Sequence, residues 1–374
     1  MTNKERYVNA LLFKPVDRVP FMEIALWGQT IERWITEGAP QDLDGGLIKG
    51  NDYFGLEGYD AVDLDAISPR PQYEERTISE DEEHVTFTDG MGRTRMALKS
   101  GTVRGTRMSM DTYLSFAVKD RASFNEMRRR YEGPVEERYP ADYDEQVRRV
   151  RSVDKPLTLL DPLSGTFGYY SMLRNWFGTE PLSYMFYDDP GLIHDCLDVL
   201  TEFILRLMAR AARDVKFDFY YVHEDMAGKG GPLMGPNLFR EFLLPHYKRF
   251  LGFLRSSGVR VILVDTDGDF EALIPLFLEA GVDGFGPMEV AAGMDPVGMR
   301  KKHGKRYSMA GGVDKRSIAR GKTTIDHEID DVIVPLLADG GLIPMIDHSV
   351  PPDVSLDNFR YYLERKREVV FRGA

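Results

Sequence analysis

The sequence predicts an α/β fold, a single (β/α)8 TIM barrel with an insertion after its second strand. Five apolar runs in the second half of the chain each end in carboxylates or a histidine. Helical stretches of about 10–20 residues alternate with these runs, which is typical of βα units and a parallel sheet. A parallel barrel gathers the carboxyl ends of its strands at one mouth, so polar strand ends predict an active site there.

Eight βα units account for most of the chain. The predicted strands are residues 19–25, 59–67, 157–161, 218–225, 261–267, 282–289, 307–314 and 342–348. The predicted helices are residues 4–13, 29–38, 165–213, 236–257, 269–280, 293–303, 315–338 and 353–371. An open doubly wound sheet is the alternative, but no G-x-G-x-x-G motif follows any of these strands.

Residues 69–156 interrupt this alternation of strands and helices and form the predicted insertion. Residues 83–88 and 93–98 flank a glycine-containing loop, which predicts a hairpin. Charged helical stretches are expected at 121–132 and 141–152. The segment has too few apolar residues for its own core, so residues 1–374 are interpreted as one domain.

Composition narrows the possible partners. The formal net charge is −12, which disfavours nucleic acid and also carboxylate-rich substrates. Cys196 is the only cysteine, so an intrachain disulfide or a thiolate metal cluster is not expected. The start of the sequence has no apolar signal region, and no run approaches the roughly 18 apolar residues of a membrane helix. We therefore expect a cytoplasmic protein without membrane contact.

Carboxylates at strand ends are candidate metal ligands. Asp265 and Asp267 are two residues apart, so in an extended chain their side chains project the same way and repel unless a cation or proton lies between them. The alternative is a loop in which one acid caps the following helix. Glu289 ends an apolar stretch and needs a metal, a substrate cation or a basic side chain, with a salt bridge to a neighbouring helix as the structural alternative.

Histidines and a glycine-rich loop supply further candidates. His348 follows an apolar strand and could act as a general acid or bind a metal. His223 and Glu224 point to opposite faces of an extended chain, so only one can enter the mouth. We expect His223 to be a partly buried packing residue. Lys229 lies in a glycine-rich loop that could bind an anion or serve as a flexible lid. Trp27 and Tyr170 could line an aromatic pocket or simply belong to the core.

Five short motifs occur in an order that resembles the uroporphyrinogen decarboxylase superfamily over nearly the whole length. They are residues 14–20, 63–67, 224–228, 311–315 and 347–352. The resemblance implies a (β/α)8 barrel. It places Asp65 where the decarboxylase has the aspartate that faces the pyrrole nitrogens, and His348 at the site histidine. It also implies that Glu224 and Asp225, the latter in place of a serine, lie near the site.

Two departures from the family pattern bear on the substrate. The decarboxylase binds substrate propionates with arginines near its N-terminus, but residues 21–28 contain no arginine and present Glu23 instead. Thiol-methylating relatives hold zinc with a His-x-Cys pair and a later cysteine, where this chain has Asp265-Thr266-Asp267. Oxygen and imidazole ligands suit a metal that polarises an ether or hydroxyl oxygen.

The sequence and the resemblance together predict a methyltransferase. It would move a methyl group from a small donor, for example a methoxylated one, to a corrinoid protein that presents cobalamin. The resemblance also implies a homodimer. The expected catalytic residues are His348, Asp65, Glu224 and Asp225. The expected substrate-binding residues are Glu23, Trp27, Tyr170 and Lys229, and the ligands of zinc or another divalent metal are Asp265, Asp267, Glu289 and His348.

Two other functions stay open at this stage. The first is a decarboxylase of a porphyrinogen-like or smaller acid, in which Asp65 stabilises a protonated intermediate and His348 positions the substrate. The missing arginines argue against it. The second is a barrel that binds a small molecule without turnover.

Overall fold

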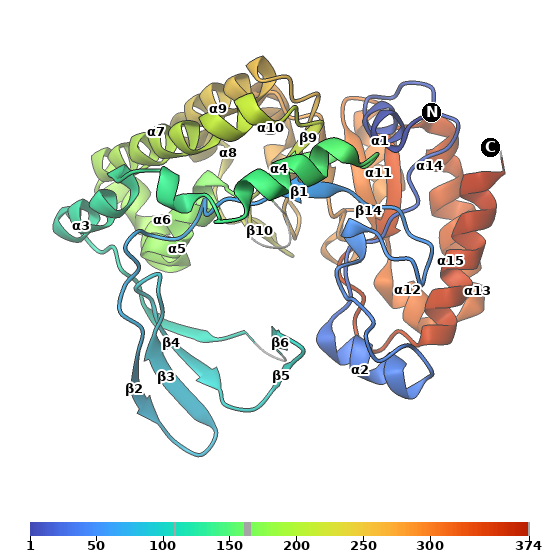
Figure 1. Ribbon diagram of the computed structural model, residues 1–374, viewed down its shortest axis with the longest axis horizontal. Coiled ribbons are helices and arrows are strands. Elements are labelled where there is room, and N and C mark those ends of the chain that lie inside the picture. Colours follow the sequence, from blue (N-terminus) through green and yellow to red (C-terminus); the bar gives the residue numbers. More distant parts are fainter. Residues whose placement is uncertain (108–109, 161–165, 373–374) are drawn as a thin grey trace.

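A seven-stranded parallel sheet forms the centre of the molecule (Figure 1), and the computed structural model describes residues 1–107, 110–160 and 166–372. The strand order is β1-β8-β9-β12-β13-β14-β15. The strands are β1 Asp60–Val62, β8 Leu157–Leu159, β9 Phe219–His223, β12 Val261–Asp265, β13 Gly284–Gly286, β14 Ser308–Val313 and β15 Leu342–Ile346. Seven of the eight predicted strands, all except the first, are thus present, and they follow the predicted order.

The sheet curls around an apolar interior. Alternate residues of β9 and β12, such as Phe219 and Val261, share one buried cluster with Ile343 from the far edge strand β15. Period-two alternation places these side chains on one face of each strand. Tyr7, from the N-terminal helix, is buried in the same cluster. Central strands and the edge strand β15 therefore contribute to one interior, which is consistent with a barrel.

The predicted first strand is not a regular strand. Residues 19–25 form no strand or bridge, and the next residue, Leu26, makes a single parallel bridge to Val350 beyond the end of β15. The backbone here instead forms hydrogen bonds with residues outside the sheet. The N–H of Leu26 donates to the carbonyl oxygen of Gly45 (2.8 Å), and the carbonyl oxygen of Ile24 accepts from the N–H of Ile48 (2.9 Å). The expectation of eight regular strands is wrong here because local loop contacts replace the ladder.

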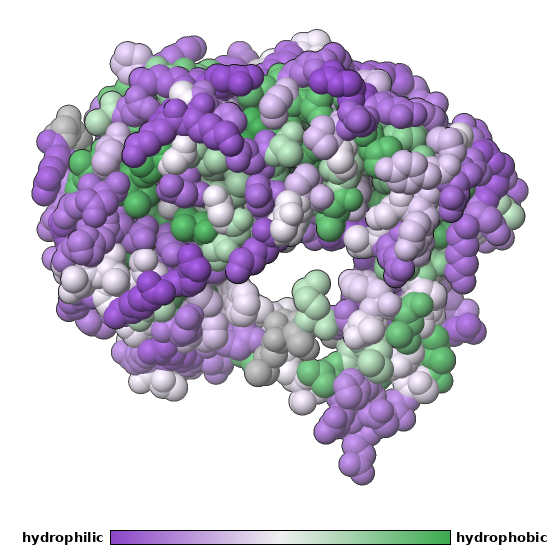
Figure 2. Space-filling view, turned by 180° about the vertical axis from the view of Figure 1, so that it is seen from behind, coloured by the Kyte–Doolittle hydropathy of each residue, from purple (hydrophilic) through white to green (hydrophobic). Residues whose placement is uncertain are grey.

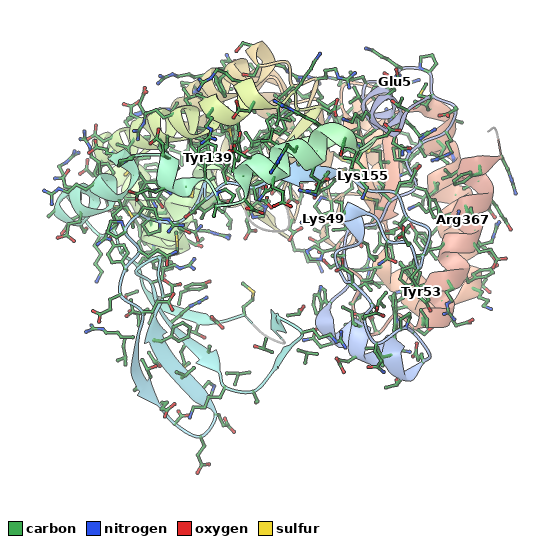
Figure 3. The ribbon with its side chains drawn as sticks, viewed as in Figure 1. Glu5, Lys49, Tyr53, Tyr139, Lys155 and Arg367 are labelled. Carbon is green, nitrogen blue, oxygen red and sulfur yellow. The ribbon has the colours of Figure 1, made fainter. Side chains whose placement is uncertain are left out.

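The loops that follow this segment are held to the rest of the sheet. Lys155 Nζ donates to the carbonyl oxygen of Lys49 at 2.7 Å, and the two residues lie close together in Figure 3. This bond ties the loop before β8 to the 3-10 turn at Leu47–Lys49.

Helices surround the sheet, and the first of them packs against its interior cluster. They are α1 Asn3–Leu11, α2 Gly28–Thr36, α5 Tyr169–Phe177, α6 Thr179–Asp188, α7 Pro190–Asp214, α8 Pro236–Leu238, α9 Leu244–Ser256, α10 Ile274–Ala280, α11 Pro296–His303, α12 Lys315–Arg320, α13 Lys322–His327, α14 Val334–Asp339 and α15 Leu356–Phe371. Within the described ranges, no helix combines the length and apolar character that crossing a bilayer requires.

The insertion after β1 is an antiparallel sheet followed by two helices. Its elements are β2 Arg76–Glu80, β3 His84–Thr88, β4 Thr94–Leu98, β5 Thr102–Val103, β6 Thr106–Arg107, β7 Thr112–Ser115, α3 Arg121–Glu132 and α4 Tyr143–Ser152. The predicted hairpin is confirmed as β3 and β4. The flanking strands β2 and β7 and the small β5–β6 hairpin were not predicted.

The β5–β6 hairpin contacts helix α2, so the insertion forms an arch beside the barrel, with an opening between arch and body that is visible in Figure 2. Arg104 Nε donates to Glu32 Oε1 at 2.5 Å, and the N–H of Gly28 donates to Thr106 Oγ1 at 3.0 Å. A Cβ on Gly28 would lie 1.9 Å from the carbonyl oxygen of Val103. Only glycine therefore allows this close approach.

Candidate active site

A cavity of about 200 Å³ lies at the carboxyl ends of the central strands. Its position agrees with the mouth of a parallel barrel, where the side chains that follow each strand converge. The lining residues are Ile24, Ile48, Tyr221, His223, Asp225, Asp265, Asp267, Gly286, Pro287, Ala310, Met345, His348 and Ser349. Apolar walls thus enclose a small group of carboxylates and imidazoles.

His223 and Asp265 form the first pair in this cavity. They are register partners on the adjacent parallel strands β9 and β12, and His223 Nδ1 lies 2.9 Å from Asp265 Oδ2. His223 faces the cavity because it lies two residues beyond Tyr221, which lines the cavity on the same strand face. Burial lowers the pKa of His223, but the hydrogen bond and charge of Asp265 outweigh it and raise this pKa to about 9. His223 is therefore an imidazolium at neutral pH.

His348 and Asp267 form the second pair. His348 Nε2 lies 3.5 Å from Asp267 Oδ2, although His348 follows β15 and Asp267 follows β12. The interaction with Asp267 raises the pKa of His348, while partial burial opposes it. Burial would raise the pKa of Asp267, but the nearby charges of His348, Lys315 and His223 lower it. Both shifts favour the charged forms of this pair.

Asp225 lines the cavity, as predicted, but Glu224 does not. Arg174 of α5 pairs with the Asp225 carboxylate and also donates to its carbonyl oxygen at 2.9 Å. Glu224 points the other way and accepts from the N–H groups of Tyr170 (3.0 Å) and Ser171 (2.9 Å) in the first turn of α5. A fully buried carboxylate there satisfies free helix N–H groups. The structure therefore reverses the expectation for this strand end: His223 enters the mouth and Glu224 holds the helix.

Glu23 and Asp65 also lie outside the cavity lining. Glu23 is fully buried and forms an ion pair with Lys366 (2.6 Å), while Tyr362 donates to the same carboxylate oxygen at 2.7 Å. Asp65 binds the side chain of Arg70 (2.7 Å), five residues further along the same loop. Both carboxylates are occupied by protein groups, and neither is among the residues that line the cavity.

The three remaining predicted binding residues are likewise not part of the lining. Trp27 immediately precedes α2 and is half-buried. Tyr170 is buried in α5, where burial raises its hydroxyl pKa to about 12. Lys229 is exposed at the tip of the short hairpin between β10 Ala227–Gly228 and β11 Gly231–Pro232.

Glu289 forms a hydrogen bond and an ion pair with neighbouring protein groups. A salt bridge to a neighbouring helix was the structural alternative to metal binding. Its Oε2 accepts from Gly268 N–H at 3.0 Å, and its Oε1 lies 3.6 Å from Lys315 Nζ in the neighbouring helix α12. Among the described residues, no three His, Cys, Asp or Glu side chains are arranged to hold a metal ion. Asp265 and Asp267 each face a histidine rather than each other. The residues present therefore do not fit the expected metal centre.

Sequence reasoning missed His223, Arg174 and Lys315 as parts of this region. Period-two alternation could have identified His223, since Tyr221 and His223 share a strand face. Arg174 and Lys315 lie on helices and reach the site only through the tertiary fold. No spacing in the sequence relates Arg174 to Asp225 or Lys315 to Glu289.

Comparison with known proteins relates the chain to one family. The family model described as uroporphyrinogen decarboxylase (URO-D) matches residues 131–369. A uroporphyrinogen decarboxylase of Thermus thermophilus is 26% identical over 190 residues, and the match covers 50% of this chain and 51% of that protein. The chain thus matches only about half the length of that relative.

A solved structure extends the likeness over nearly the whole chain. It is described as a methyltransferase from Methanosarcina mazei, with a TM-score of 0.61 and 18% identity. The alignment covers 98% of this chain and 99% of that one. At this identity the likeness establishes a shared fold.

Proposed function

The chain belongs to the uroporphyrinogen decarboxylase family, and from that premise we propose that it is a methyltransferase acting on a small, uncharged methoxylated compound. The methyl group would pass to a corrinoid on a carrier protein. The observation that carries the proposal is a small cavity that contains two histidine–aspartate pairs. The fold shared with a methyltransferase supports it.

The size and charge of the cavity favour a small neutral donor. Its volume of about 200 Å³ is below the roughly 300–1,000 Å³ typical of sites for drug-sized ligands. Among the described lining residues there is no arginine or lysine, and three aspartates face two imidazoles. The aspartates already occupy both imidazoles, so a substrate carboxylate finds no free cationic partner among these lining residues. A carboxylate-rich porphyrinogen is therefore disfavoured.

The imidazolium of His348 is the proposed general acid. A methyl ether is a poor methyl donor because negative charge develops on the departing oxygen. Transfer of the His348 proton to that oxygen would accompany cleavage of the carbon–oxygen bond and release an alcohol or phenol. Asp267 would orient the ring and stabilise its charge before transfer. The corrinoid would supply a low-valent cobalt nucleophile that accepts the methyl group.

The test uses the full chain and free cob(I)alamin as methyl acceptor. Donors are 2-methoxyethanol and methoxybenzene, with methoxyacetate and 4-methoxybenzoate as matched anions. We expect the neutral donors to give methylcobalamin and the demethylated alcohol in equal amounts, and the anions to react much more slowly. Absorbance measures the corrin product, and chromatography measures the alcohol.

Three other outcomes would count against the proposed methyl transfer. Carbon dioxide released from a carboxylated substrate without any corrinoid would favour the decarboxylase alternative. Preference for the anionic donors would contradict the charge argument. No methyl transfer from any of the four donors would remove support for the proposal.

A further inference from the structure

A chain of hydrogen bonds and ion pairs beside the cavity connects the loop that carries Asp267 with the segment that carries His348. Gly268, the residue after Asp267, donates its N–H to Glu289 Oε2 at 3.0 Å. The other carboxylate oxygen of Glu289 lies 3.6 Å from Lys315 Nζ. The loop that carries Asp267 is therefore linked to the first residue of α12.

Asp347, the residue before His348, completes this chain of interactions. Lys315 donates its backbone N–H to Asp347 Oδ1 at 3.2 Å, and its Nζ lies 3.8 Å from the same oxygen. Asp347 Oδ2 accepts from the N–H of Val290, the neighbour of Glu289, at 3.0 Å. The segments that follow β12, β13, β14 and β15 are thus linked around the ammonium group of Lys315.

Lys315 carries the charge that makes this arrangement stable. Asp347 is fully buried, and Glu289 is mostly buried. Among the described residues, Lys315 is the only ion-pair partner of either carboxylate. A buried carboxylate without a partner costs several kcal/mol, so without Lys315 these groups would move apart, take up protons or admit water.

We propose that Lys315 is a positioning residue for the His348–Asp267 pair. It does not line the cavity, so it acts without touching the substrate. Its ammonium group holds Glu289 and Asp347, and these hold the backbone on either side of the pair. The kinetic consequence rests on the proposed methyl transfer, whereas the geometric consequence does not.

The experiment compares Lys315→Met with Lys315→Arg in the full chain. Lys315→Met removes the charge at similar length, and Lys315→Arg retains it. Lys322→Met in α13 is the matched control, because Lys322 pairs with Asp357 at the exposed surface. The first readout is kcat and KM for methoxybenzene with cob(I)alamin. The second is the NMR signal of the proton on Nε2 of His348, the ring nitrogen nearest Asp267, assigned by its loss in His348→Gln.

Positioning predicts a specific pattern. Lys315→Met should lower kcat roughly 10- to 100-fold, as is typical when groups that orient a reacting residue are removed. Its KM should change less than about threefold, since no substrate contact is lost. The His348 proton signal should shift or broaden in Lys315→Met, whereas Lys315→Arg and Lys322→Met should keep both the signal and most of kcat.

Other outcomes overturn the inference. An unchanged His348 signal and kcat in Lys315→Met would show that Lys315 does not position the pair. Equal loss in Lys315→Arg and Lys315→Met would show that the charge is not what matters. If the wild-type chain transfers no methyl group, the proposed function fails, and the NMR comparison alone decides the role of Lys315.

Discussion

At the scale of single residues, the two aspartates at the end of β12 each pair with a different histidine. Asp265 pairs with a histidine on the adjacent strand, whereas Asp267, two residues later, reaches a histidine that follows β15. Both imidazoles are stabilised in their charged form by these contacts. Two proton donors therefore border one small cavity, which is a suitable environment for acid-assisted release of an oxygen leaving group.

Replacing His348 by glutamine should lower kcat for methyl transfer about a hundredfold or more, because glutamine hydrogen-bonds but cannot deliver a proton. KM should change little. Steady-state kinetics with methoxybenzene and cob(I)alamin measures both. His327→Gln on the exposed helix α13 is the control. A His348→Gln enzyme as fast as the control would exclude His348 as the acid.

The His223–Asp265 pair should also make stability depend on pH. The pKa of His223 is raised from an ordinary value near 6.5 to about 9. Its contribution to stability is therefore fully present below about pH 6.5 and is lost as pH rises through 9. Since the side chain is 41% exposed, solvent screening limits the effect to about 1 kcal/mol.

Urea unfolding at pH 6.5 and pH 9 measures this difference. Asp265→Asn removes the partner charge, so this variant should lose less stability than the wild type over the same interval. Identical pH dependence in the two proteins would show that Asp265 does not raise the pKa of His223.

At the scale of elements, the β5–β6 hairpin closes the arch by docking on α2. The contact consists mainly of one ion pair, Arg104 with Glu32, and the bond between Gly28 and Thr106. Most residues of the insertion strands are exposed or only half-buried. Elements with few buried apolar contacts open at low free-energy cost. The arch should therefore open more readily than the barrel unfolds.

Gly28→Ala should release the hairpin, because the added Cβ would lie 1.9 Å from the carbonyl oxygen of Val103. Hydrogen exchange followed by mass spectrometry should show faster exchange at residues 102–106 and little change in the central strands. Gly252→Ala in α9 is the control, since a Cβ there meets nothing within 4 Å. Unchanged exchange at the hairpin in Gly28→Ala would contradict this account of the contact.

At the scale of the whole molecule, a buried ion pair joins segments that lie far apart in the sequence. Glu23, near the start of the barrel, pairs with Lys366 of the last helix, and both side chains are fully buried. Glu23 also accepts from the N–H of Ile346 in β15 at 2.9 Å. One carboxylate thus fastens the irregular first segment to the last strand and the last helix.

Lys366→Met should destabilise the chain by about 3–5 kcal/mol, because it leaves Glu23 buried without a counter-charge. Denaturant unfolding measures the free energy. Adding Glu23→Gln to Lys366→Met should recover part of the loss, since a neutral amide can still accept from Tyr362. A double variant less stable than Lys366→Met alone would show that the unpaired charge is not the cause.

The pattern of apolar runs was enough to predict most of the parallel strands and their order. Apolar runs and polar strand ends are local properties, and both are present in β9, β12 and β15. The first segment departed from its prediction because its backbone partners, Gly45 and Ile48, lie in irregular loops. The arch was only partly predicted, since the two-residue strands β5 and β6 depend on docking against α2.

The sequence by itself determined that polar strand ends meet at one edge of the fold, because parallel strands bring their carboxyl ends together. Only the tertiary structure decided which of them face the cavity and with whom they pair. A shift of one residue along a strand turns a side chain to the other face, as His223 and Glu224 illustrate. Partners such as Lys315, Arg174 and Lys366 come from helices whose packing no local pattern specifies.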